Sequence, residues 1–362
     1  MTPIAGLDIH HTAYLGPDGE AVKALPADLS TPDVLAGLYR DMVFARLFDA
    51  RAITLQRTGR LGTYASLLGQ EAVGVGVGHA MRAEDVLLPS FREHAVQLKR
   101  GVLPEEIYRY WGGDERGSDF AGPREDFPVC ITVGGHTPQA AGVALAFKLR
   151  GEARVAVCVM GDGATSKGDF YEGLNAAGVW QLPFVCVVTN NQWAISTPRR
   201  EQTAAETLAQ KAIAAGIDGE QVDGNDVVAV ADVIGAALER ARSGRPSLVE
   251  CLTYRLGDHT TVDDASRYRE DAEVSAAWQR DPIARLRLYL SNHAGWDKAQ
   301  EKALLEESEQ RLEQAVQTYL DTPPEPIEAV FDHLYEQLPR PLAGQRQALL
   351  DQQQAPPESD RG

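Results

Sequence analysis

Two short apolar segments, separated by a helical pattern, dominate the middle of the chain. Residues 155–160 (VAVCVM) and 184–189 (FVCVVT) are rich in β-branched residues and too short for helices, so they predict strands buried on both faces. Strands and helices alternate from about residue 130 to the strand SLVECLTYR, which ends at Arg255. This alternation predicts an α/β fold in which helices cover both faces of a parallel sheet.

The segment before this core begins without a helical period. Residues 1–29 contain Gly, Pro and Asp and predict an N-terminal arm that lies over the surface or over another subunit. Ser30 or Thr31 then caps a helix with Pro32 in its first turn, and apolar residues recur every three or four positions until Gly59. This pattern predicts a long packing helix.

Other helices are predicted where the pattern changes again. Thr137 and Pro138 predict the start of a helix rich in small residues, and the sequence AAETLAQKAIAAG at 204–216 predicts an amphipathic helix. C-terminal helices are predicted at 281–292, 297–319 and 326–337. The chain is therefore divided into an arm at 1–29, an α/β domain with C-terminal helices at 30–337, and a Gln- and Pro-rich flexible tail at 338–362.

Composition and charge exclude several classes of function. The 362 residues carry a net charge of −17, which argues against nucleic-acid binding. The chain contains no apolar run of about 18 residues and no signal-like start, so we expect a cytoplasmic protein that does not span a membrane. Its four cysteines show no CxxC pairing, and we predict neither a disulfide nor a zinc site.

Each of the two central strands ends in residues that suit a metal-bound phosphate. Gly161-Asp162-Gly163 allows a sharp turn with exposed backbone amides, and Asn190-Asn191 follows the second strand. Because the carboxyl ends of neighbouring parallel strands meet at one edge, we expect Asp162 and Asn191 to lie side by side. One carboxylate and one amide oxygen suit Mg²⁺, which completes its octahedron with phosphate oxygens and water. These residues predict a metal-bridged diphosphate.

GDG followed by NN, between two apolar strands and across a helix, resembles the binding motif of thiamine-diphosphate enzymes. From about residue 30 to residue 337 the chain resembles the alpha subunits of the decarboxylating component of pyruvate or branched-chain 2-oxo acid dehydrogenase complexes. The segments that carry this resemblance are GQEA, FREH, GDGATSKGDFYEG, TNNQWAISTP, QVDGND and YRLGDHTTVDDASRYR.

The resemblance implies a set of site residues. Asp162, the Asn191 side chain and the Trp193 carbonyl would hold magnesium, and His259 would be the catalytic residue. The implied contacts to thiamine diphosphate are Phe91, Arg92, Ile131, Val133, Asp162, Gly163, Ala164, Asn191 and His259. Phe91 stands where the family has tyrosine, so the ring is kept and its hydroxyl is lost.

Two further groups of residues carry hypotheses, one from the family resemblance and one from helix spacing. Thr260, next to His259, occupies the place of a regulatory serine in mitochondrial relatives. Because threonine replaces serine here, the sequence leaves open whether Thr260 is phosphorylated. Asp169 and Glu172 lie three residues apart and so on one face of a helix. They either stabilise the N-terminal end of that helix or form part of an acidic path between paired cofactor sites.

The resemblance also implies the reaction and the partners. A small 2-oxo acid would lose carbon dioxide, and its acyl group would pass to a lipoyl arm of the acyltransferase core. The carboxylate that activates the cofactor would come from a separate beta subunit, in an assembly of two alpha and two beta chains. We expect pyruvate as the substrate, with 3-methyl-2-oxobutanoate, the branched-chain acid, as the alternative that the sequence leaves open. More distant alternatives are acetoin cleavage, a transketolase-like transfer, or a non-catalytic sensor.

Overall fold

A computed structural model describes residues 8–332 and 334–354 of the chain. The chain forms two units, Met1–Tyr319 and Leu320–Gly362, and the first contains the sheet and the predicted site. Among the described helices, none is both long enough and apolar enough to cross a membrane.

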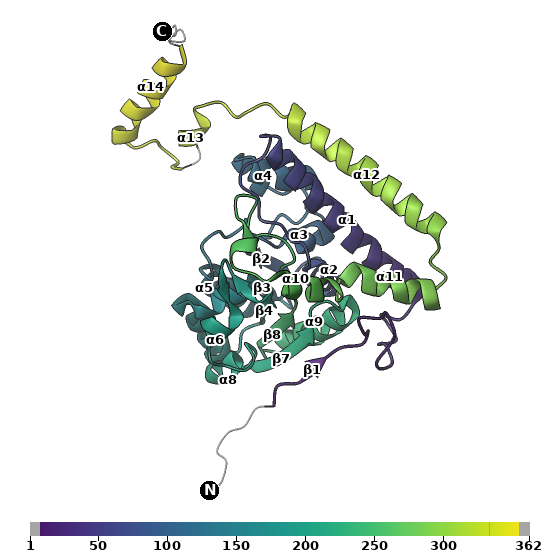
Figure 1. Ribbon diagram of the computed structural model, residues 1–362. Helices are drawn as coiled ribbons and strands as arrows, with labels where there is room; N and C mark the ends of the chain where they lie inside the picture. The colour runs from purple at the N-terminus through teal and green to yellow at the C-terminus, as the bar shows by residue number, and fades with distance from the viewer. Residues whose placement is uncertain (1–7, 333, 355–362) are drawn as a thin grey trace. The chain divides into compact units, whose positions relative to one another are not determined.

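Six strands of the described residues form one parallel sheet in the order β1-β7-β8-β4-β3-β2, and this confirms the predicted α/β fold (Figure 1). β3 and β4 pair in register, with Ala156 opposite Phe184 and Gly161 opposite Thr189. The strands are β1 (His11–Thr12), β2 (Val86–Pro89), β3 (Ala156–Gly161), β4 (Phe184–Asn190), β7 (Asp218–Asp223) and β8 (Ser247–Leu252), and a separate hairpin pairs β5 (Trp193–Ala194) with β6 (Thr197–Pro198).

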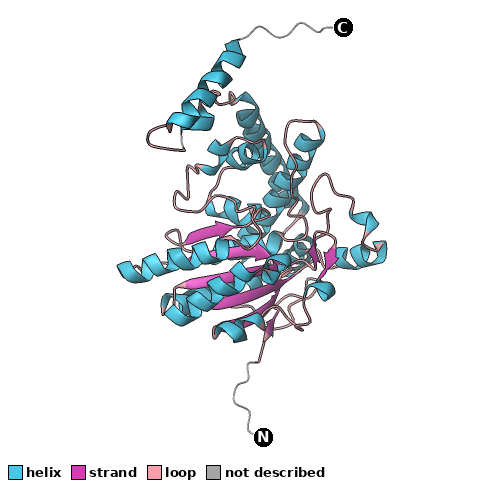
Figure 2. Cartoon of the chain, turned by 90° about the vertical axis from the view of Figure 1, so that its left-hand side faces the viewer, coloured by secondary structure: helices cyan, strands magenta, loops and turns pink. Residues whose placement is uncertain are grey.

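Helices cover both faces of the sheet, as the strands between helical layers in Figure 2 show. Along β3, Cys158 and Met160 face one apolar core while Val157 and Val159 face another. Because successive side chains of a strand alternate between faces, only a continuous apolar run can supply both cores. The first core is closed by α5 (His136–Arg150), α6 (Gly168–Trp180) and α8 (Lys211–Ala215), and the second by α2 (Glu71–Ala80), α3 (His94–Arg100) and α9 (Val227–Arg242).

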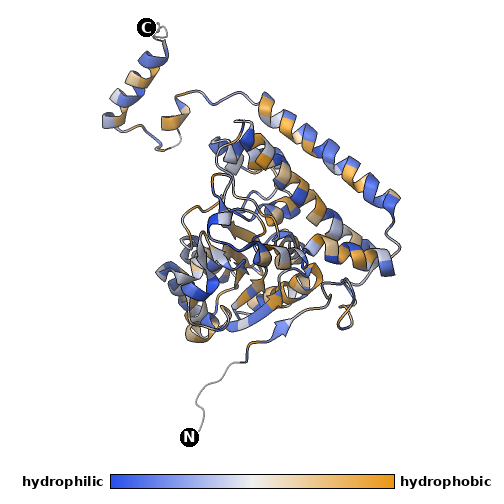
Figure 3. Ribbon diagram, in the orientation of Figure 1, coloured by the Kyte–Doolittle hydropathy of each residue, from blue (hydrophilic) through white to orange (hydrophobic). Residues whose placement is uncertain are grey.

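A third layer of helices packs outside α2. α1 (Pro32–Arg57) begins after Thr31, whose side chain accepts a hydrogen bond from Val34 N, so the predicted cap is confirmed. α12 (Lys298–Asp321) runs along α1 (Figure 1), and Tyr39 of α1 donates to Glu301 of α12 at 2.9 Å. Hydrophilic residues predominate along α12 in Figure 3, as expected of an outer helix. The layer also contains α11 (Pro282–His293).

The described part of the N-terminal arm joins the sheet. β1 pairs with β7, with His11 opposite Gln221. The carboxylate of Asp226 accepts hydrogen bonds from Tyr14 N and Leu15 N, both at 2.7 Å, and also caps α9 through Val228 N. One buried side chain therefore fixes the arm and starts a helix.

Some predicted helices have other bounds. α5 begins at His136 rather than at Pro138, with Gly135 as the N-cap. In the predicted amphipathic helix at 204–216, only α8 is helical, because the Arg199 guanidinium binds the carbonyls of Thr203, Ala205 and Glu206, which a continuous helix would use itself.

The predicted helix at 326–337 is represented by α13 (Ala329–Asp332), for which we have no physical account. α14 (Arg340–Gln354) lies in the predicted tail, residues 355–362 lie outside the described part, and the division of the chain into domains remains a prediction. The remaining short helices are α4 (Pro104–Trp111), η1 (Glu115–Ser118), η2 (Asp162–Ser166), α7 (Arg199–Gln202), η3 (Ala265–Arg267) and α10 (Asp271–Trp278).

Candidate active site

A cavity of about 200 Å³ lies at the carboxyl ends of β3 and β4, where the motif pattern predicted the site. The structure brings the predicted site residues together in its wall, apart from Ile131. The lining comprises Gln70, Ser90, Phe91, Arg92, Glu93, Val133, Gly161, Asp162, Gly163, Ala164, Asn191, Trp193, Ala194, Ile195 and His259.

Asp162 and Asn191 form one side of this cavity. Asp162 is buried at the start of η2, and its burial raises the pKa of the carboxyl above the ordinary value. Asn191 follows β4, and its side-chain nitrogen donates to Gln70 Oε1 at 3.0 Å. Its side-chain oxygen accepts from Trp193 N at 3.2 Å, so both ends of the amide are assigned by their partners.

The turn after Asn191 adopts backbone conformations that side chains rarely allow. Gln192 has φ 74° and Ile195 has φ 56°, both in the left-handed region. Between them, the Trp193 indole donates to Glu273 Oε1 at 3.1 Å, which anchors the ring. The surrounding contacts therefore hold the strained turn that carries the Trp193 carbonyl.

Gly163 is required by the same turn. A Cβ atom at Gly163 would lie 2.7 Å from the Cβ of Ala194, which is closer than two carbon atoms can approach. The glycine lets the turn after β4 close against the start of η2, and both Gly163 and Ala164 line the cavity.

The donor chemistry of this side fits magnesium bound with a diphosphate. The described residues contain no group of three or more His, Cys, Asp or Glu side chains that could hold a metal by themselves. Asp162, Asn191 and the Trp193 carbonyl instead offer one carboxylate, one amide oxygen and one backbone oxygen. Mg²⁺ accepts such a sparse set of oxygen ligands when phosphate and water complete its coordination.

Arg92 forms the cationic side of the cavity. It is buried, and it donates to the Ser66 carbonyl through Nη1 and to the His259 carbonyl through Nη2, the latter at 2.9 Å. Burial lowers the pKa of the guanidinium to about 10, and the nearby Arg255 adds to this effect. Arg92 nevertheless stays charged at neutral pH, so it offers a fixed positive charge to an anion.

His259 lies between two arginines. Its Nδ1 faces Arg92 Nη2 at 3.2 Å and Arg255 Nη1 at 3.4 Å. A guanidinium only donates hydrogen bonds, so Nδ1 accepts and the proton of the neutral ring is on Nε2. Burial first, and then the charges of Arg92 and Arg255, together lower the pKa of the imidazole to about 4.

Comparison with known proteins decides the family. A sequence profile described as "Dehydrogenase E1 component" matches residues 39–328. The chain belongs to the dehydrogenase E1 component family. Within this family it is the alpha subunit type of a 2-oxo acid dehydrogenase, and the family implies thiamine diphosphate as the cofactor.

Relatives of the E1 chain cover nearly its whole length. The pyruvate dehydrogenase E1 component subunit alpha of Bacillus subtilis (strain 168) is 40% identical over 334 residues, which is 91% of this chain and 90% of the relative. The subunit of the same name from Staphylococcus aureus (strain Mu50) is 40% identical over 317 residues, or 87% and 86% of the two chains. That of Bacillus cereus is 40% identical over 334 residues, with shares of 91% and 90%. These names do not favour the branched-chain alternative.

Of the remaining predicted residues of the E1 chain, Phe91 and Val133 line the cavity and Ile131 does not. The Phe91 ring meets the His259 ring edge to face, with 6.0 Å between centroids. The Ile131 side chain is 55% exposed. The expected role of Ile131 was a backbone contact, and this remains a prediction.

Several residues at the site were given no role by the sequence, and four of them have polar side chains that matter for its geometry or charge. Gln70 and Arg255 stand inside segments that carry the family resemblance, so the motifs GQEA and YR were their only signal. Glu93 follows Arg92 and lines the cavity, and burial raises the pKa of its carboxyl to about 7. Gln202 contacts Asp162, and no sequence pattern indicates this.

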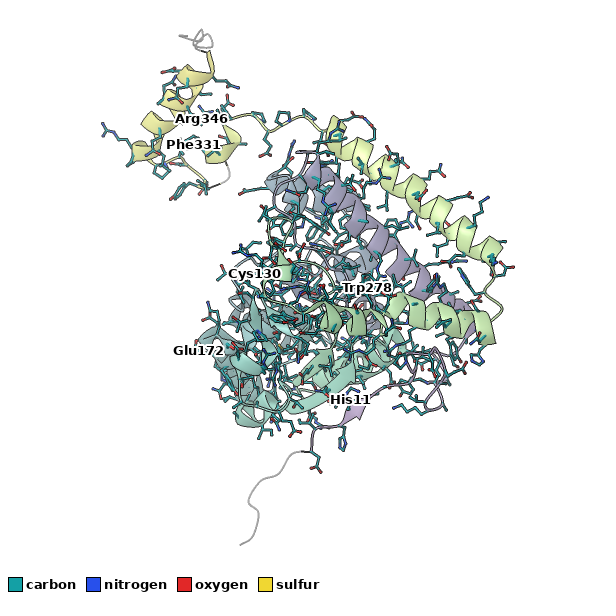
Figure 4. The ribbon with its side chains drawn as sticks, viewed as in Figure 1. His11, Cys130, Glu172, Trp278, Phe331 and Arg346 are labelled. Carbon is teal, nitrogen blue, oxygen red and sulfur yellow. The ribbon has the colours of Figure 1, made fainter. Side chains whose placement is uncertain are left out.

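Asp169 and Glu172 lie outside the cavity wall. Asp169 is in the first turn of α6 and 3.5 Å from Lys167 Nζ, in an exposed ion pair. Glu172 is exposed on the same helix, at the periphery of the chain in Figure 4. The acidic path between paired cofactor sites therefore remains a prediction.

Proposed function

We propose that this chain is the alpha subunit of a pyruvate dehydrogenase of the acetyl-transferring kind. It would bind thiamine diphosphate and Mg²⁺, act on pyruvate with a separate beta subunit, and pass the acetyl group to a lipoyl disulfide. The observation that carries the proposal is the cavity itself, whose wall contains Asp162, Asn191, Arg92 and His259. The names of the relatives support pyruvate as the substrate.

The metal side of the cavity would hold the diphosphate. Asp162, the Asn191 side-chain oxygen and the Trp193 carbonyl would bind Mg²⁺. The backbone of Gly163 and Ala164 would meet the diphosphate directly. All of these groups belong to the ends of β3 and β4 or the turns after them, so the sheet sets their spacing.

Arg92 and His259, also in the wall of the cavity, supply hydrogen bonds and charge. Arg92 would compensate the negative diphosphate, and His259 would donate a hydrogen bond from Nε2, because its Nδ1 is engaged by the arginines. The Phe91 ring and the backbone of Ile131 and Val133 would line the cofactor. When bound, thiamine diphosphate supplies the electron sink that allows a 2-oxo acid to release carbon dioxide.

The partners belong to the same proposal. The carboxylate that activates the cofactor would come from a beta subunit, in a cytoplasmic assembly of two alpha and two beta chains that serves a lipoyl-bearing acyltransferase core. Electrons from the decarboxylation would reduce the lipoyl disulfide, one sulfur taking the acetyl group and the other a proton. No nucleic acid and no membrane would take part.

The metal assignment is tested with Asp162→Ala. This change removes the only carboxylate of the proposed set, so thiamine diphosphate binding in the presence of Mg²⁺ should collapse while the melting temperature changes little. Isothermal calorimetry on the chain co-expressed with its beta partner measures the binding. Unchanged affinity would refute the assignment.

The division of the site and the choice of substrate are tested together. The purified alpha chain should not decarboxylate pyruvate, and activity should appear when the beta chain is added in equal amounts. Pyruvate and 3-methyl-2-oxobutanoate are then compared by kcat/KM. Turnover by the alpha chain alone would contradict the divided site, and a preference for the branched-chain acid would contradict the substrate.

A further inference from the structure

Gln202 reaches the proposed metal site from outside the predicted motifs. It is the last residue of α7, and its Nε2 donates to Asp162 Oδ2 at 2.6 Å and to the Thr197 carbonyl at 3.2 Å. Its Oε1 is buried and has no hydrogen-bond partner among the described residues. The same side chain therefore holds the Asp162 carboxylate and presents an unused acceptor.

The orientation of this amide is fixed by its neighbours. Both contacts of Nε2 are to oxygen atoms that only accept, so the nitrogen and not the oxygen must face them. Turning the amide over would place its single oxygen, Oε1, against two acceptors. Oε1 is consequently directed away from both, and a buried acceptor without a donor costs free energy.

The segment that carries Gln202 is joined to the turn that carries Trp193. Arg199 N, at the start of α7, donates to the Gln192 carbonyl at 2.8 Å. Trp193 and Ala194 form β5, which pairs with β6 directly before α7. Two of the three proposed magnesium ligands, Asp162 and the Trp193 carbonyl, are therefore both connected to α7. A shift of α7 would move them together.

We propose that Gln202 is a positioning residue of the metal site. Its nitrogen orients the Asp162 carboxylate, and its oxygen accepts a hydrogen bond from a water molecule bound to the metal. This inference rests on the proposed binding of Mg²⁺ with the diphosphate. Such an arrangement is chemically complete, because Mg²⁺ keeps part of its hydration shell and a bound water provides the donor that Oε1 lacks.

The test is the affinity for a divalent cation in the assembled alpha and beta enzyme. Mn²⁺ replaces Mg²⁺, and free Mn²⁺ is measured by electron paramagnetic resonance at saturating thiamine diphosphate. Gln202→Leu should raise the Mn²⁺ dissociation constant by about 10- to 100-fold, the range for loss of such a partner. Activity should return when Mg²⁺ is raised, since kcat with the metal bound does not depend on this residue in the proposal.

Gln210→Leu is the matched control. Gln210 lies in the segment that follows, and its side chain accepts from Thr207 N, away from Asp162. This variant should bind Mn²⁺ as the unchanged enzyme does. If Gln202→Leu fails to fold, Gln202→Asn replaces it, because the shorter amide keeps its polarity but withdraws from Asp162 and should also weaken Mn²⁺ binding.

Asp162→Ala separates the two proposals. If Asp162→Ala abolishes Mn²⁺ binding while Gln202→Leu and Gln202→Asn leave it unchanged, the role of Gln202 is wrong and the metal site stands. If Asp162→Ala also binds Mn²⁺ normally, the metal site itself is wrong. Weaker binding in the Gln210→Leu control to the same extent as in Gln202→Leu would likewise overturn the specific role.

Discussion

One nitrogen of Arg92, Nη2, contacts two atoms of His259. It donates to the His259 carbonyl at 2.9 Å and faces Nδ1 of the same residue at 3.2 Å. Ser66, through its carbonyl, holds the other arm of the guanidinium. The orientation of the imidazole is therefore set by a residue 167 positions earlier in the chain.

The protonation state of His259 follows from this contact. With its pKa lowered to about 4, the ring should be neutral at pH 6, where a free imidazole with a pKa of about 6.5 is largely charged. Nitrogen-15 NMR of the histidine side chains should show the Nε2–H tautomer down to about pH 5. A cationic ring at pH 6, or the Nδ1–H tautomer, would contradict the geometry.

Arg92→Lys tests whether a forked donor is needed. Lysine keeps the charge, but one ammonium group cannot reach both the Ser66 and the His259 carbonyls in the arginine geometry. We expect thiamine diphosphate to bind about 10- to 100-fold more weakly, as the loss of one or more charge-assisted hydrogen bonds predicts. Calorimetry measures the affinity, and the exposed Arg200→Lys serves as the control. Equal affinities in both variants would show that charge alone suffices.

Asp49 should make stability depend on pH. Its buried carboxylate accepts from Tyr64, Ser66 and Leu67, yet burial raises its pKa from 3.8 to about 6. The folded chain therefore keeps this proton to a higher pH than the unfolded chain does. The resulting stabilisation of the folded state is fully present below pH 3.8 and is lost as the pH rises through about 6. The size is about 3 kcal/mol for a shift of about two pKa units.

Urea unfolding of the chain and of Asp49→Asn between about pH 4 and pH 7 measures this contribution as a difference between the two. The free energy of unfolding of the unchanged chain should fall relative to the variant as pH rises. Asp33→Asn, at an exposed position in the first turn of the same helix, should run parallel to the unchanged chain. Parallel curves for Asp49→Asn as well would contradict the burial argument.

Gly163→Ala should overpack the turn against η2. The added Cβ would lie 2.7 Å from the Cβ of Ala194, and such overpacking costs about 1–3 kcal/mol. Adding Ala194→Gly removes the clash and should restore the melting temperature. Gly161→Ala, where no heavy atom lies within 4 Å of an added Cβ, should not lower stability in this way. Failure of the double variant to recover would place the cause elsewhere.

The sequence predicted those parts of the site that depend on strand topology. Buried parallel strands are continuous apolar runs, so β3 and β4 were visible from their composition. Once both strands are assigned, Asp162 and Asn191 must meet at one sheet edge. The same reasoning predicted the α/β fold, whereas the positions of Arg92 and His259 rested on the resemblance to a family.

Side-chain contacts such as those of Gln202 and Arg199 could not be predicted from the pattern of apolar and polar positions. Gln202 meets Asp162 across 40 positions, after a turn whose left-handed residues Gln192 and Ile195 are neither Gly nor Asn. The shortened α8 depends on Arg199 binding three carbonyls, a side-chain competition that periodicity does not register. In both cases a long polar side chain makes the contact, and the pattern of apolar positions does not indicate which partner such a side chain will bind.

The pairing of β1 with β7 also sets an order of events during synthesis. His11 meets Gln221, so the first strand leaves the ribosome some two hundred residues before its neighbour exists. Until then the arm has no strand to join, and afterwards the free edge of β7 stays open to other chains until the arm arrives. A chain that lost its arm would fold with this edge uncovered and would be prone to associate with nascent copies of itself.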